Sequence, residues 1–383
     1  MKFFQKRNKK LFVKAVWLGF VFAICFSRIL NVLADGLSFT NELDKAYESD
    51  KQTNFEQSIV HYTQALQIQT NRPHSAIAYL SRGRAYLKTK QFDKAERDFN
   101  EAVLRAPDRE FLRDAYYLRG LFQQEMTNYQ ESLNDFTKAI RLKPDFQRAY
   151  VSRAKSYLAQ SNFDFCISDC NLAILLNTND VAAYFYKGAA YKFQQDYDKE
   201  IEALTQAIKL ATNFTSFAPV FLDRAYAFTV KEDFTNAIAD YGMVVQLDPA
   251  NVDAYVGRGL FLSRQGDFAS GMADSEKAIQ LDSNCFTAYN NLAWMLATAA
   301  EAKLRDGKRA VEFATRACEL SKWKEPYCLG TLAAAFAETG KFDEAIKWEE
   351  KCIQMGLPNE KDMVQARHEL ELFKQGKPYD ADK

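Results

Sequence analysis

The sequence has few of the residues that interrupt regular structure and lacks the short motifs of well-known chemistry. Only 8 of its 383 residues are proline and 15 are glycine, which leaves little room for disordered linkers. GxxxxGK followed by Ser or Thr, GxSxG, HExxH and GxGxxG are all absent. His61, His74 and His368 are dispersed, and no cysteine pair has the CxxC spacing of a metal site. We therefore expect a non-enzymatic protein with no catalytic residues, no cofactor and no metal.

A net charge is also missing, because 50 basic residues balance 50 acidic ones. Seven of the basic residues precede the first acidic residue, Asp35: Lys2, Lys6, Arg7, Lys9, Lys10, Lys14 and Arg28. The remaining chain has 43 basic residues (50 less 7) against 50 acidic ones, a net charge of −7. A body of that sign binds nucleic acid and anionic lipid poorly, so we expect neither as a non-specific partner.

Long apolar runs are lacking, except for one near the N-terminus. Residues 15–27 are apolar, follow a cationic segment and precede Val32-Leu33-Ala34, which is the pattern of a secretory signal cleaved after Ala34. The alternative is an uncleaved anchor over residues 11–33, although Arg28 and Asn31 interrupt that span. Either way we expect an exported protein of the periplasm or cell envelope, with inner-membrane anchoring as the alternative.

Six cysteines follow the N-terminal segment: Cys166, Cys170, Cys285, Cys318, Cys328 and Cys352. Export would permit disulfides. Cys166 and Cys170 fall on the spacing of small or aromatic residues elsewhere in the chain, so we expect them to be buried hydrophobes. Spacing alone cannot choose a pair among Cys318, Cys328 and Cys352, and a bridge there stays open.

An aromatic residue three positions before a residue that is usually small recurs along the chain. The pairs are Phe55/Ser58, Phe92/Ala95, Tyr129/Ser132, Phe163/Cys166, Tyr197/Glu200, Phe234/Ala237, Phe268/Gly271 and Phe342/Ala345. A further copy at Ala310 has Gly307 in place of the aromatic residue. Successive copies are 34 to 39 residues apart, and such a fixed period indicates an array of identical supersecondary units.

The apolar spacing inside one copy is helical. In residues 76–107, Tyr79, Gly83 and Tyr86 form one set and Phe92, Ala95, Phe99 and Ala102 form another, with gaps of three or four residues. A short polar turn, residues 88–91, separates the two sets. Each unit is therefore predicted to be a helix–turn–helix hairpin.

These residues resemble the tetratricopeptide repeat (TPR), whose signature has 34 residues. Tyr116, Gly120, Tyr129, Phe136 and Ala139 match in the same register. The resemblance implies an all-α, right-handed superhelical solenoid of antiparallel hairpins, with repeats starting near residues 39, 76, 113, 147, 181, 218, 252, 286 and 326. We expect the array over residues 35–357 and a capping helix and tail over 358–383.

Some departures from the period are visible. The eighth repeat has extra residues in its turn, 297–306, and three junctions are three residues longer than the basic period, near 71–73, 108–110 and 213–215. We expect these insertions to lengthen helix ends or loops without stopping the stack. The first helix of the first repeat matches the pattern poorly.

A ladder of charges runs in phase with the repeats. The basic residues are Arg82, Arg119, Arg153, Lys187, Arg224 and Arg258. Sixteen residues after each one stand Asp98, Asp135, Asp169, Ala203, Asp240 and Asp274. The ladder is either a basic stripe for an acidic ligand or a set of ion pairs within the hairpins, and the matched phase favours the ion pairs.

The resemblance also implies that the first helices line a concave groove. Carried over by register, the candidate groove residues are Leu80, Arg84, Tyr117, Leu121, Val151, Lys155, Phe185, Ala189, Leu222, Tyr226, Val256, Leu260, Asn290 and Trp294. This mixture of aromatic and apolar groups suits an extended peptide or a partner helix. The Lys/Asn/Arg constellation with which some relatives clamp a chaperone tail is not found on these faces.

The functional hypothesis is a protein–protein interaction scaffold of the cell envelope, of the bacterial exported type. One alternative is an exported receptor for a glycan or other polymer that stacks on Tyr117, Tyr226 and Trp294. Another is a membrane-anchored structural tether, if the N-terminal segment stays uncleaved. The identity of the partner and the oligomeric state are left open.

Overall fold

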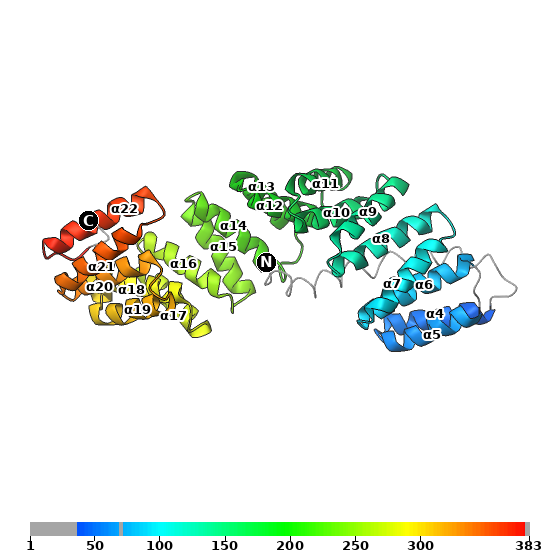
Figure 1. Cartoon of the computed structure of the whole chain (residues 1–383), viewed down its shortest axis with the longest axis horizontal. Coiled ribbons are helices and arrows are strands. Elements are labelled where there is room, and N and C mark those ends of the chain that lie inside the picture. Colours follow the sequence, from blue (N-terminus) through cyan, green and yellow to red (C-terminus); the bar gives the residue numbers. More distant parts are fainter. Residues whose placement is uncertain (1–36, 69–71, 380–383) are drawn as a thin grey trace. The chain divides into compact units, whose positions relative to one another are not determined.

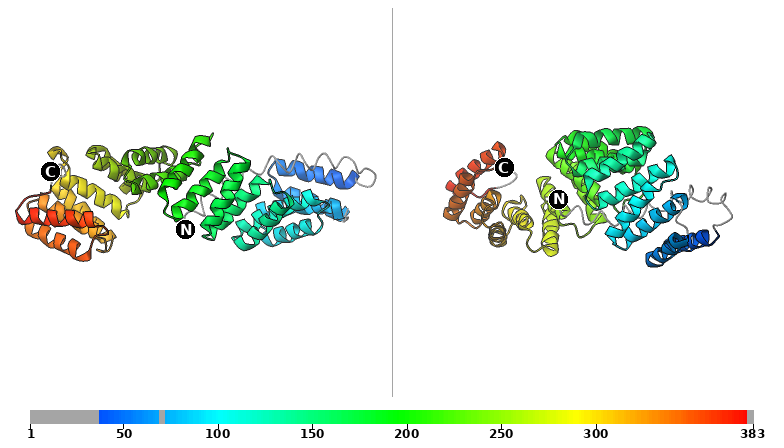
Figure 2. Two further views of the ribbon diagram at one scale, coloured as in Figure 1. Left: turned by 90° about the horizontal axis from the view of Figure 1, so that it is seen from above. Right: turned by 45° about the vertical axis from the view of Figure 1, so that its right-hand side comes forward.

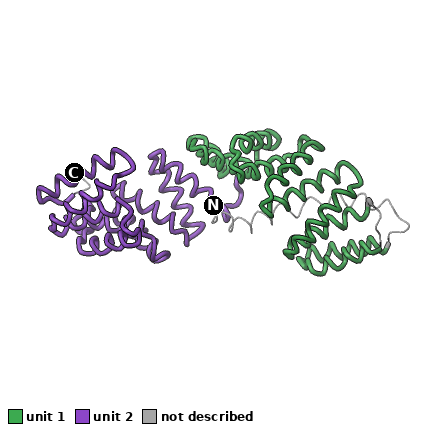
Figure 3. Tube along the Cα trace, in the orientation of Figure 1, with its two compact units in different colours: residues 1–210 green, residues 211–383 purple. Residues whose placement is uncertain are grey.

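The computed structural model describes residues 37–68 and 72–379. They form 19 α-helices and one short 3-10 helix, with no strand in these two segments. The chain divides into two compact units, residues 1–210 and 211–383 (Figure 3). The proposed signal segment, residues 1–34, and the alternative anchor, residues 11–33, lie outside the described residues.

The described part of unit 1 consists of five helix hairpins (Figure 1). Their helices are α4 (Leu37–Lys51) and α5 (Phe55–Ile68), α6 (Arg72–Lys88) and α7 (Phe92–Leu104), α8 (Arg109–Glu125) and α9 (Tyr129–Leu142), α10 (Gln147–Ala159) and α11 (Phe163–Leu176), and α12 (Val181–Phe193) and α13 (Tyr197–Leu210). Within unit 1, the second helix of each of the first four hairpins contacts the first helix of the next.

Unit 2 continues the same pattern with four hairpins and one final helix. The helices are α14 (Ala218–Val230) and α15 (Phe234–Leu247), α16 (Val252–Arg264) and α17 (Phe268–Leu281), α18 (Phe286–Thr298) and α19 (Gly307–Leu320), α20 (Pro326–Glu338) and α21 (Phe342–Met355), and α22 (Glu360–Lys374). Figure 2 shows that, within each unit, neighbouring hairpins follow their order in the sequence. The predicted all-α array of nine hairpins and a capping helix is confirmed for the described chain.

Close approach of the two helices in a hairpin depends on a small residue facing a large one. A β-carbon added at Gly120 of α8 would lie 2.7 Å from the ring of Phe136 on α9, closer than real side chains allow. Ala95, Phe99 and Ala102 are fully buried on one side of α7. The recurring small and aromatic residues therefore decide how tightly the hairpins close.

Most hairpin turns contain one residue in the left-handed backbone region. In unit 1 these residues include Thr53, Lys90, Thr127 and Ser161, all with φ between 59° and 64°. In unit 2, Gly266 and Gly340 take this position with φ of 87° and 75°. The turn conformation is thus kept even where a non-glycine residue makes it less favourable.

The long junctions are accommodated in two ways. The helices α6 and α8 have 17 residues against 13 in α10, so the insertions before them extend their N-termini by about one turn. The insertion near 213–215 lies instead in the loop between α13 and α14, beside the division into units. The first repeat has a regular helix, α4, with Phe39 and Ala46 buried.

The long turn of the eighth hairpin contains the 3-10 helix Ala302–Leu304. Asp306 caps α19 by accepting a hydrogen bond from the backbone N–H of Arg309 at 3.1 Å. A β-carbon at Gly307 would lie 2.9 Å from Thr339 Cγ2 and close to Glu338. In other repeats an aromatic side chain stands at the position of Gly307. Here the C-terminal end of α20 occupies the space that such a side chain would need.

The charge ladder forms ion pairs within the hairpins, as predicted. Arg153 Nε donates to Asp169 Oδ2 at 2.7 Å and Nη2 donates to Oδ1 at 2.8 Å. The same two-bonded geometry joins Arg82 to Asp98, Arg119 to Asp135, Arg224 to Asp240 and Arg258 to Asp274. Burial raises the pKa of Asp169 even though the guanidinium of Arg153 acts to lower it.

Three of these arginines also reach the preceding hairpin. Arg153 Nη1 donates to Thr137 Oγ1 at 3.0 Å, and Thr137 lies on α9. Arg82 and Arg119 make equivalent bonds to Thr63 at 3.1 Å and to Asn100 at 2.9 Å. The guanidinium therefore connects consecutive hairpins as well as the two helices of its own.

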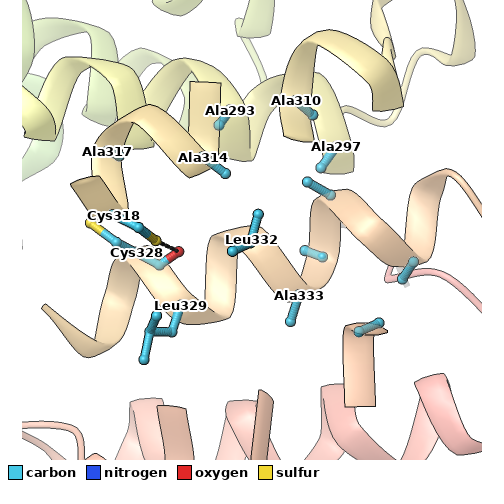
Figure 4. Packing of buried hydrophobic residues seen from close by; sticks show 14 of the residues in the cluster. Ala293, Ala297, Ala310, Ala314, Ala317, Cys318, Cys328, Leu329, Leu332 and Ala333 are labelled. Carbon is cyan, nitrogen blue, oxygen red and sulfur yellow. Dashed lines mark hydrogen bonds between the residues drawn. The ribbon is translucent and has the colours of Figure 1, made fainter. Parts of the chain in front are cut away.

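All six cysteines in the described chain are free thiols. Cys166 and Cys170 are fully buried, which confirms their predicted packing role. Cys318 donates to the backbone oxygen of Cys328 at 3.4 Å, within an alanine- and leucine-rich core formed by α18 to α21 (Figure 4). None of the described helices has the length and apolarity needed to cross a membrane.

Removal of one partner of a ladder pair should destabilise unit 1. We expect Asp169→Ala to lower the free energy of unfolding by about 2–3 kcal/mol, because the charge of Arg153 stays largely buried without its carboxylate. Arg153→Met should have a similar effect. Urea unfolding followed by circular dichroism measures both variants.

The double variant Arg153→Met/Asp169→Ala separates pairing from other effects. If the two residues act as a pair, its destabilisation is at least about 1 kcal/mol smaller than the sum of the single variants. Strict additivity would contradict the pairing. Glu131→Gln, on the exposed face of α9, is the control and should leave stability nearly unchanged.

Candidate partner-binding surface

The first helices of successive hairpins form a row on one side of each unit. In unit 1, α8 contacts α10 and α10 contacts α12; in unit 2, α16 contacts α18 and α18 contacts α20. These contacts skip the intervening second helices, α9 and α11 in one unit and α17 and α19 in the other. Successive first helices are therefore in direct contact with one another. The side on which they lie is the inner side of each stack.

Polar bonds join this row in unit 1. Gln124 of α8 donates through Nε2 to the backbone oxygen of Ser152 at 2.8 Å and to Ser156 Oγ at 2.6 Å. The Tyr117 hydroxyl lies 3.4 Å from Ser152 Oγ. Gln147 of α10 donates to Asp180, which caps α12. The surface is thus continuous from α8 to α12.

The candidate groove residues of unit 1 differ in their exposure. Lys155 is exposed, whereas Arg84, Tyr117, Leu121, Phe185 and Ala189 are half-buried. Leu80 and Val151 are buried, with 4% and 9% of their surface exposed. These two residues support the surface from below and offer little contact area to a partner.

Tyr117 is held by its own repeat and the next. Its ring centre lies 5.9 Å from that of Phe136 and 4.9 Å from that of Phe146. Burial raises the pKa of its hydroxyl. This aromatic residue acts as packing between hairpins.

The candidate residues of unit 2 lie on α14, α16 and α18. Tyr226 is the most open of them, with 48% of its surface exposed. Leu222, Val256, Leu260, Asn290 and Trp294 are half-buried. An exposed tyrosine with partly covered apolar neighbours resembles the centre of many protein interfaces.

Two asparagines on α18 carry buried amide atoms with unused hydrogen-bonding capacity. Within the described chain, Asn290 Oδ1 and Asn291 Nδ2 have no hydrogen-bond partner. Buried polar groups are usually paired, so such atoms identify places where a bound molecule could supply the missing partner. One amide offers an acceptor and the other a donor, which are the two groups that a peptide backbone presents.

Trp294, one turn further along α18, is partly covered by the chain's own tail. Its ring centre lies 5.6 Å from that of Tyr379, in the segment that follows α22. Both rings pack against the core cluster of α18 to α22. The tail therefore occupies part of the surface that the register assigns to a partner.

Two carboxyl groups are buried together next to α20, the first helix of the last hairpin. Glu349 of α21 and Glu369 of α22 are almost fully buried, and Gln365 donates to Glu369 Oε1 at 2.8 Å. A β-carbon at Gly330 of α20 would lie 3.7 Å from Glu349 Oε2. Burial raises the pKa of both carboxyl groups, and their mutual repulsion further raises that of Glu349.

Glu349 stands at a core position of the repeat. Phe99, Phe136, Leu204 and Tyr241 occupy the equivalent place on other second helices and are all buried. An acid at this position weakens the last hairpin at neutral pH unless a carboxyl group stays protonated.

Four hairpins match family models described as "Tetratricopeptide repeat". The matched residues are 76–109, 114–146, 181–214 and 252–285. They cover most of α6–α7 and α8–α9 and all of α12–α13 and α16–α17. The chain is a tetratricopeptide-repeat protein. TPR repeats indicate a scaffold for protein–protein interaction, because TPR proteins bind other proteins or peptides, and the fold is typically non-catalytic.

A solved TPR structure shares this fold. The C-terminal part of a TPR repeat-containing protein from Cytophaga hutchinsonii is 17% identical, with a TM-score of 0.53 over 64% of this chain and 98% of that one. A TPR protein from Parabacteroides merdae is 17% identical, with a TM-score of 0.49 over 68% of this chain and 100% of that one.

Human sperm-associated antigen 1 is 34% identical to this TPR protein over 96 residues. The match covers 25% of this chain, which spans about a tenth of the length of that curated relative. The similarity is thus confined to a few repeats.

Sequence reasoning identified Asn290 and Trp294 but missed Asn291, Tyr379 and the Glu349–Glu369 pair. Asn291 directly follows a candidate position, so two consecutive amides on a first helix were a usable signal. Glu349 could have been found as an acid at a repeat position that is otherwise apolar. Nothing in the sequence pattern brings Tyr379 next to Trp294, because the tail lies outside the repeat.

The buried acids should make the stability of unit 2 fall as pH rises. Both folded-state pKa values lie above the ordinary value of 4.5, so above about pH 4.5 the folded state binds more protons than the unfolded state. The contribution of these two groups to stability is therefore most favourable at or below about pH 4.5. It is lost as the pH rises toward their folded-state pKa values. Glu349→Gln should reduce this loss and stabilise the protein at pH 8.

Urea unfolding midpoints at several pH values between about 5 and 8 measure the effect. Glu350→Gln is the matched control, since Glu350 is the next residue and is exposed. Parallel pH profiles for Glu349→Gln and the unaltered protein would contradict the assignment.

Proposed function

We propose that this TPR protein is an exported scaffold of the cell envelope that binds a peptide segment or a partner helix on its first-helix surface. The observation that carries the proposal is the pair of unpartnered amide atoms on α18, at Asn290 and Asn291. They lie on the first-helix row, where a peptide backbone could supply both missing hydrogen bonds. Asn290 stands at the repeat position on which the partner surface was predicted, and Asn291 is the residue that follows it.

The exposed aromatic and half-buried apolar side chains on the first helices support a protein partner. Tyr226 offers an exposed ring, and half-buried apolar side chains lie along α14, α16 and α18. Aromatic anchors with partly buried apolar neighbours supply much of the energy in peptide recognition. In unit 1, Lys155 and half-buried Phe185 form the corresponding surface on α10 and α12.

The contact between Trp294 and Tyr379 supports the same kind of ligand. An aromatic side chain from a segment without regular secondary structure already packs there, preceded by Lys377 and Pro378. The glycan alternative requires exposed rings, and the rings of Tyr117 and Trp294 are instead packed against neighbouring aromatic residues. Tyr226, with 48% of its surface exposed, is the most open of the three proposed platforms.

Site-specific crosslinking tests the protein-binding proposal. A photoreactive phenylalanine analogue at Tyr226 should capture a protein partner, whereas the same analogue at Asn236, exposed on α15 of the same hairpin, should not. Tyr226→Ala and Asn290→Ala should each weaken binding of the captured partner by about tenfold or more, as measured by calorimetry. Asn236→Ala should bind normally.

Two results would contradict the proposal. One is equal crosslinking from Tyr226 and Asn236. The other is retention on polysaccharide without any protein partner, which would support the glycan receptor instead.

Export is proposed from the N-terminal sequence: a cationic segment, the apolar residues 15–27 and Ala34 at the cleavage position. The mass of the chain recovered from its natural host tests it. We expect a mature chain that begins at Asp35 in the envelope fraction. An intact N-terminus in the membrane fraction would favour the anchored tether, and an intact N-terminus in the cytoplasm would contradict export.

A further inference from the structure

The residues that follow the last helix turn toward the first-helix row. The helix α22 ends at Lys374, and Gly376 takes a left-handed backbone conformation with φ of 66°. The backbone N–H of Gly376 donates to the oxygen of Phe373 at 3.0 Å. The N–H of Lys377 donates to the oxygen of Leu372 at the same distance. These two hydrogen bonds form a helix-terminating turn that favours glycine and changes the direction of the chain.

Residues 375–379 are the described part of the tail. Within it, Tyr379 is half-buried, whereas the four residues before it are exposed. Pro378 fixes one of its own backbone angles and restricts those of Lys377. The direction in which the tail leaves α22 is therefore set by Gly376 and Pro378, so little further backbone freedom is lost when Tyr379 packs.

The tail is not needed to cap the stack. The buried side of α22 consists of Ala366, Glu369 and Phe373, and this helix packs on α21 and α20. It thus covers the face of the last hairpin that would otherwise be open, as repeat arrays require. The tail continues beyond this contact and brings the ring centre of Tyr379 to 5.6 Å from that of Trp294 on α18.

To reach that contact, the tail passes α20. In the row of first helices α20 lies between α18 and α22, since it contacts both. Ala334 of α20 stands at the repeat position of Trp294, and Ala337 follows on the next turn. Both alanines are 2% exposed and belong to the cluster against which Trp294 and Tyr379 pack. Most other repeats have a larger side chain at the position of Ala334: Arg84, Leu121, Lys155, Tyr226 and Leu260. Short side chains on α20 thus leave space for the tail.

Trp294 belongs to the surface on which the proposed function places a partner. Asn290, whose Oδ1 atom has no hydrogen-bond partner within the described chain, lies one turn before it on the same face of α18. A peptide that bonds to this amide therefore comes within reach of the Trp294 ring. Because Tyr379 already covers part of that ring, the peptide and the tail compete for it.

We propose, on the basis of the proposed function, that the tail is an internal competitor for the partner site on α18. Tyr379 occupies the place beside Trp294 in the free protein. A partner that binds there displaces the tail and presents an aromatic side chain of its own, similar in size to tyrosine, to the same ring. The apparent affinity for the partner is reduced by the fraction of molecules in which the tail is docked.

The competition is of moderate strength. The short connection through residues 375–378 gives Tyr379 an effective concentration of about 1 mM or more at the site. A contact made mainly through one aromatic pair is weak by itself, with a dissociation constant of a few hundred micromolar for the separate segment. The docked state is therefore favoured by about three- to tenfold, which a partner with further contacts along the row overcomes.

A synthetic peptide with the sequence of residues 374–383 tests the site without knowledge of the partner. The peptide carries fluorescein and is added to the full chain, and its anisotropy is measured at protein concentrations from about 1 to 500 µM. We expect the Tyr379→Ala chain, in which the site is vacant, to bind the peptide at least about threefold more tightly than the unaltered chain. Trp294→Ala should abolish binding, and a peptide with alanine in place of its tyrosine should not bind.

Gly376→Ala releases the tail in a second way. Alanine is unfavourable at φ of 66°, so the turn weakens while Tyr379 and Trp294 are both kept. This variant should also bind the peptide more tightly than the unaltered chain. Circular dichroism checks that each variant retains its helical signal.

Lys374→Gln is the matched control. Lys374 is exposed at the end of α22, outside the tail, and its Nζ atom lies 2.9 Å from Glu371 Oε1. This variant should bind the peptide like the unaltered chain. Equal binding by the Tyr379→Ala and unaltered chains overturns the proposal, as does the absence of binding to Tyr379→Ala up to about 500 µM.

The partner captured from Tyr226 separates this inference from the proposed function. If the tail competes, Tyr379→Ala binds that partner at least about threefold more tightly, whereas Asn290→Ala binds it more weakly. A partner that Asn290→Ala weakens but Tyr379→Ala leaves unchanged overturns the competition and supports the proposed function. Peptide binding at Trp294 without any captured protein contradicts the proposed function alone.

Discussion

Close packing between the two helices of each hairpin is the constraint on which the rest of the structure depends. A small residue on the first helix faces a large side chain on the second, as Gly120 faces the ring of Phe136. This contact fixes the distance between the helices and therefore the position of every exposed side chain on the first-helix row. A partner surface composed of residues from several repeats can exist only because the same distance recurs in each of them.

The ion pairs join the two helices of a hairpin by hydrogen bonds, in addition to the apolar packing between them. Each guanidinium makes two parallel bonds to a carboxylate of its own hairpin, and those of Arg82, Arg119 and Arg153 also bond to the preceding hairpin. The fifth hairpin has Ala203 in place of the aspartate and nevertheless keeps the same pair of helices, α12 and α13. The pairs are therefore not needed for the hairpin to form. Where they are present, they join its two helices and, in three repeats, also join it to the preceding hairpin.

Departures from the repeat are where the chain gains individual properties. The exposed Phe165 and Leu172 of α11, the amide of Asn290 and the buried acid Glu349 each replace the residue type that the other repeats favour. All three stand on a regular helix, so the fold tolerates them. Their cost to stability differs, since a buried carboxyl group is far more unfavourable than an exposed leucine.

The sequence by itself determined the hairpin, its period and the capping helix, because the aromatic and small residues recur at helical spacing and in one register. It also determined the ion pairs, since a constant separation of sixteen residues keeps both charges on facing sides of a hairpin. Tertiary structure alone decided which groove residues are covered: Leu80 and Val151 lie below the surface, Tyr117 is packed by Phe146 of the next hairpin, and Trp294 is met by Tyr379 of the tail. The physical reason is that local spacing fixes the face on which a residue lies, whereas exposure depends on which neighbouring hairpin or tail packs over that face.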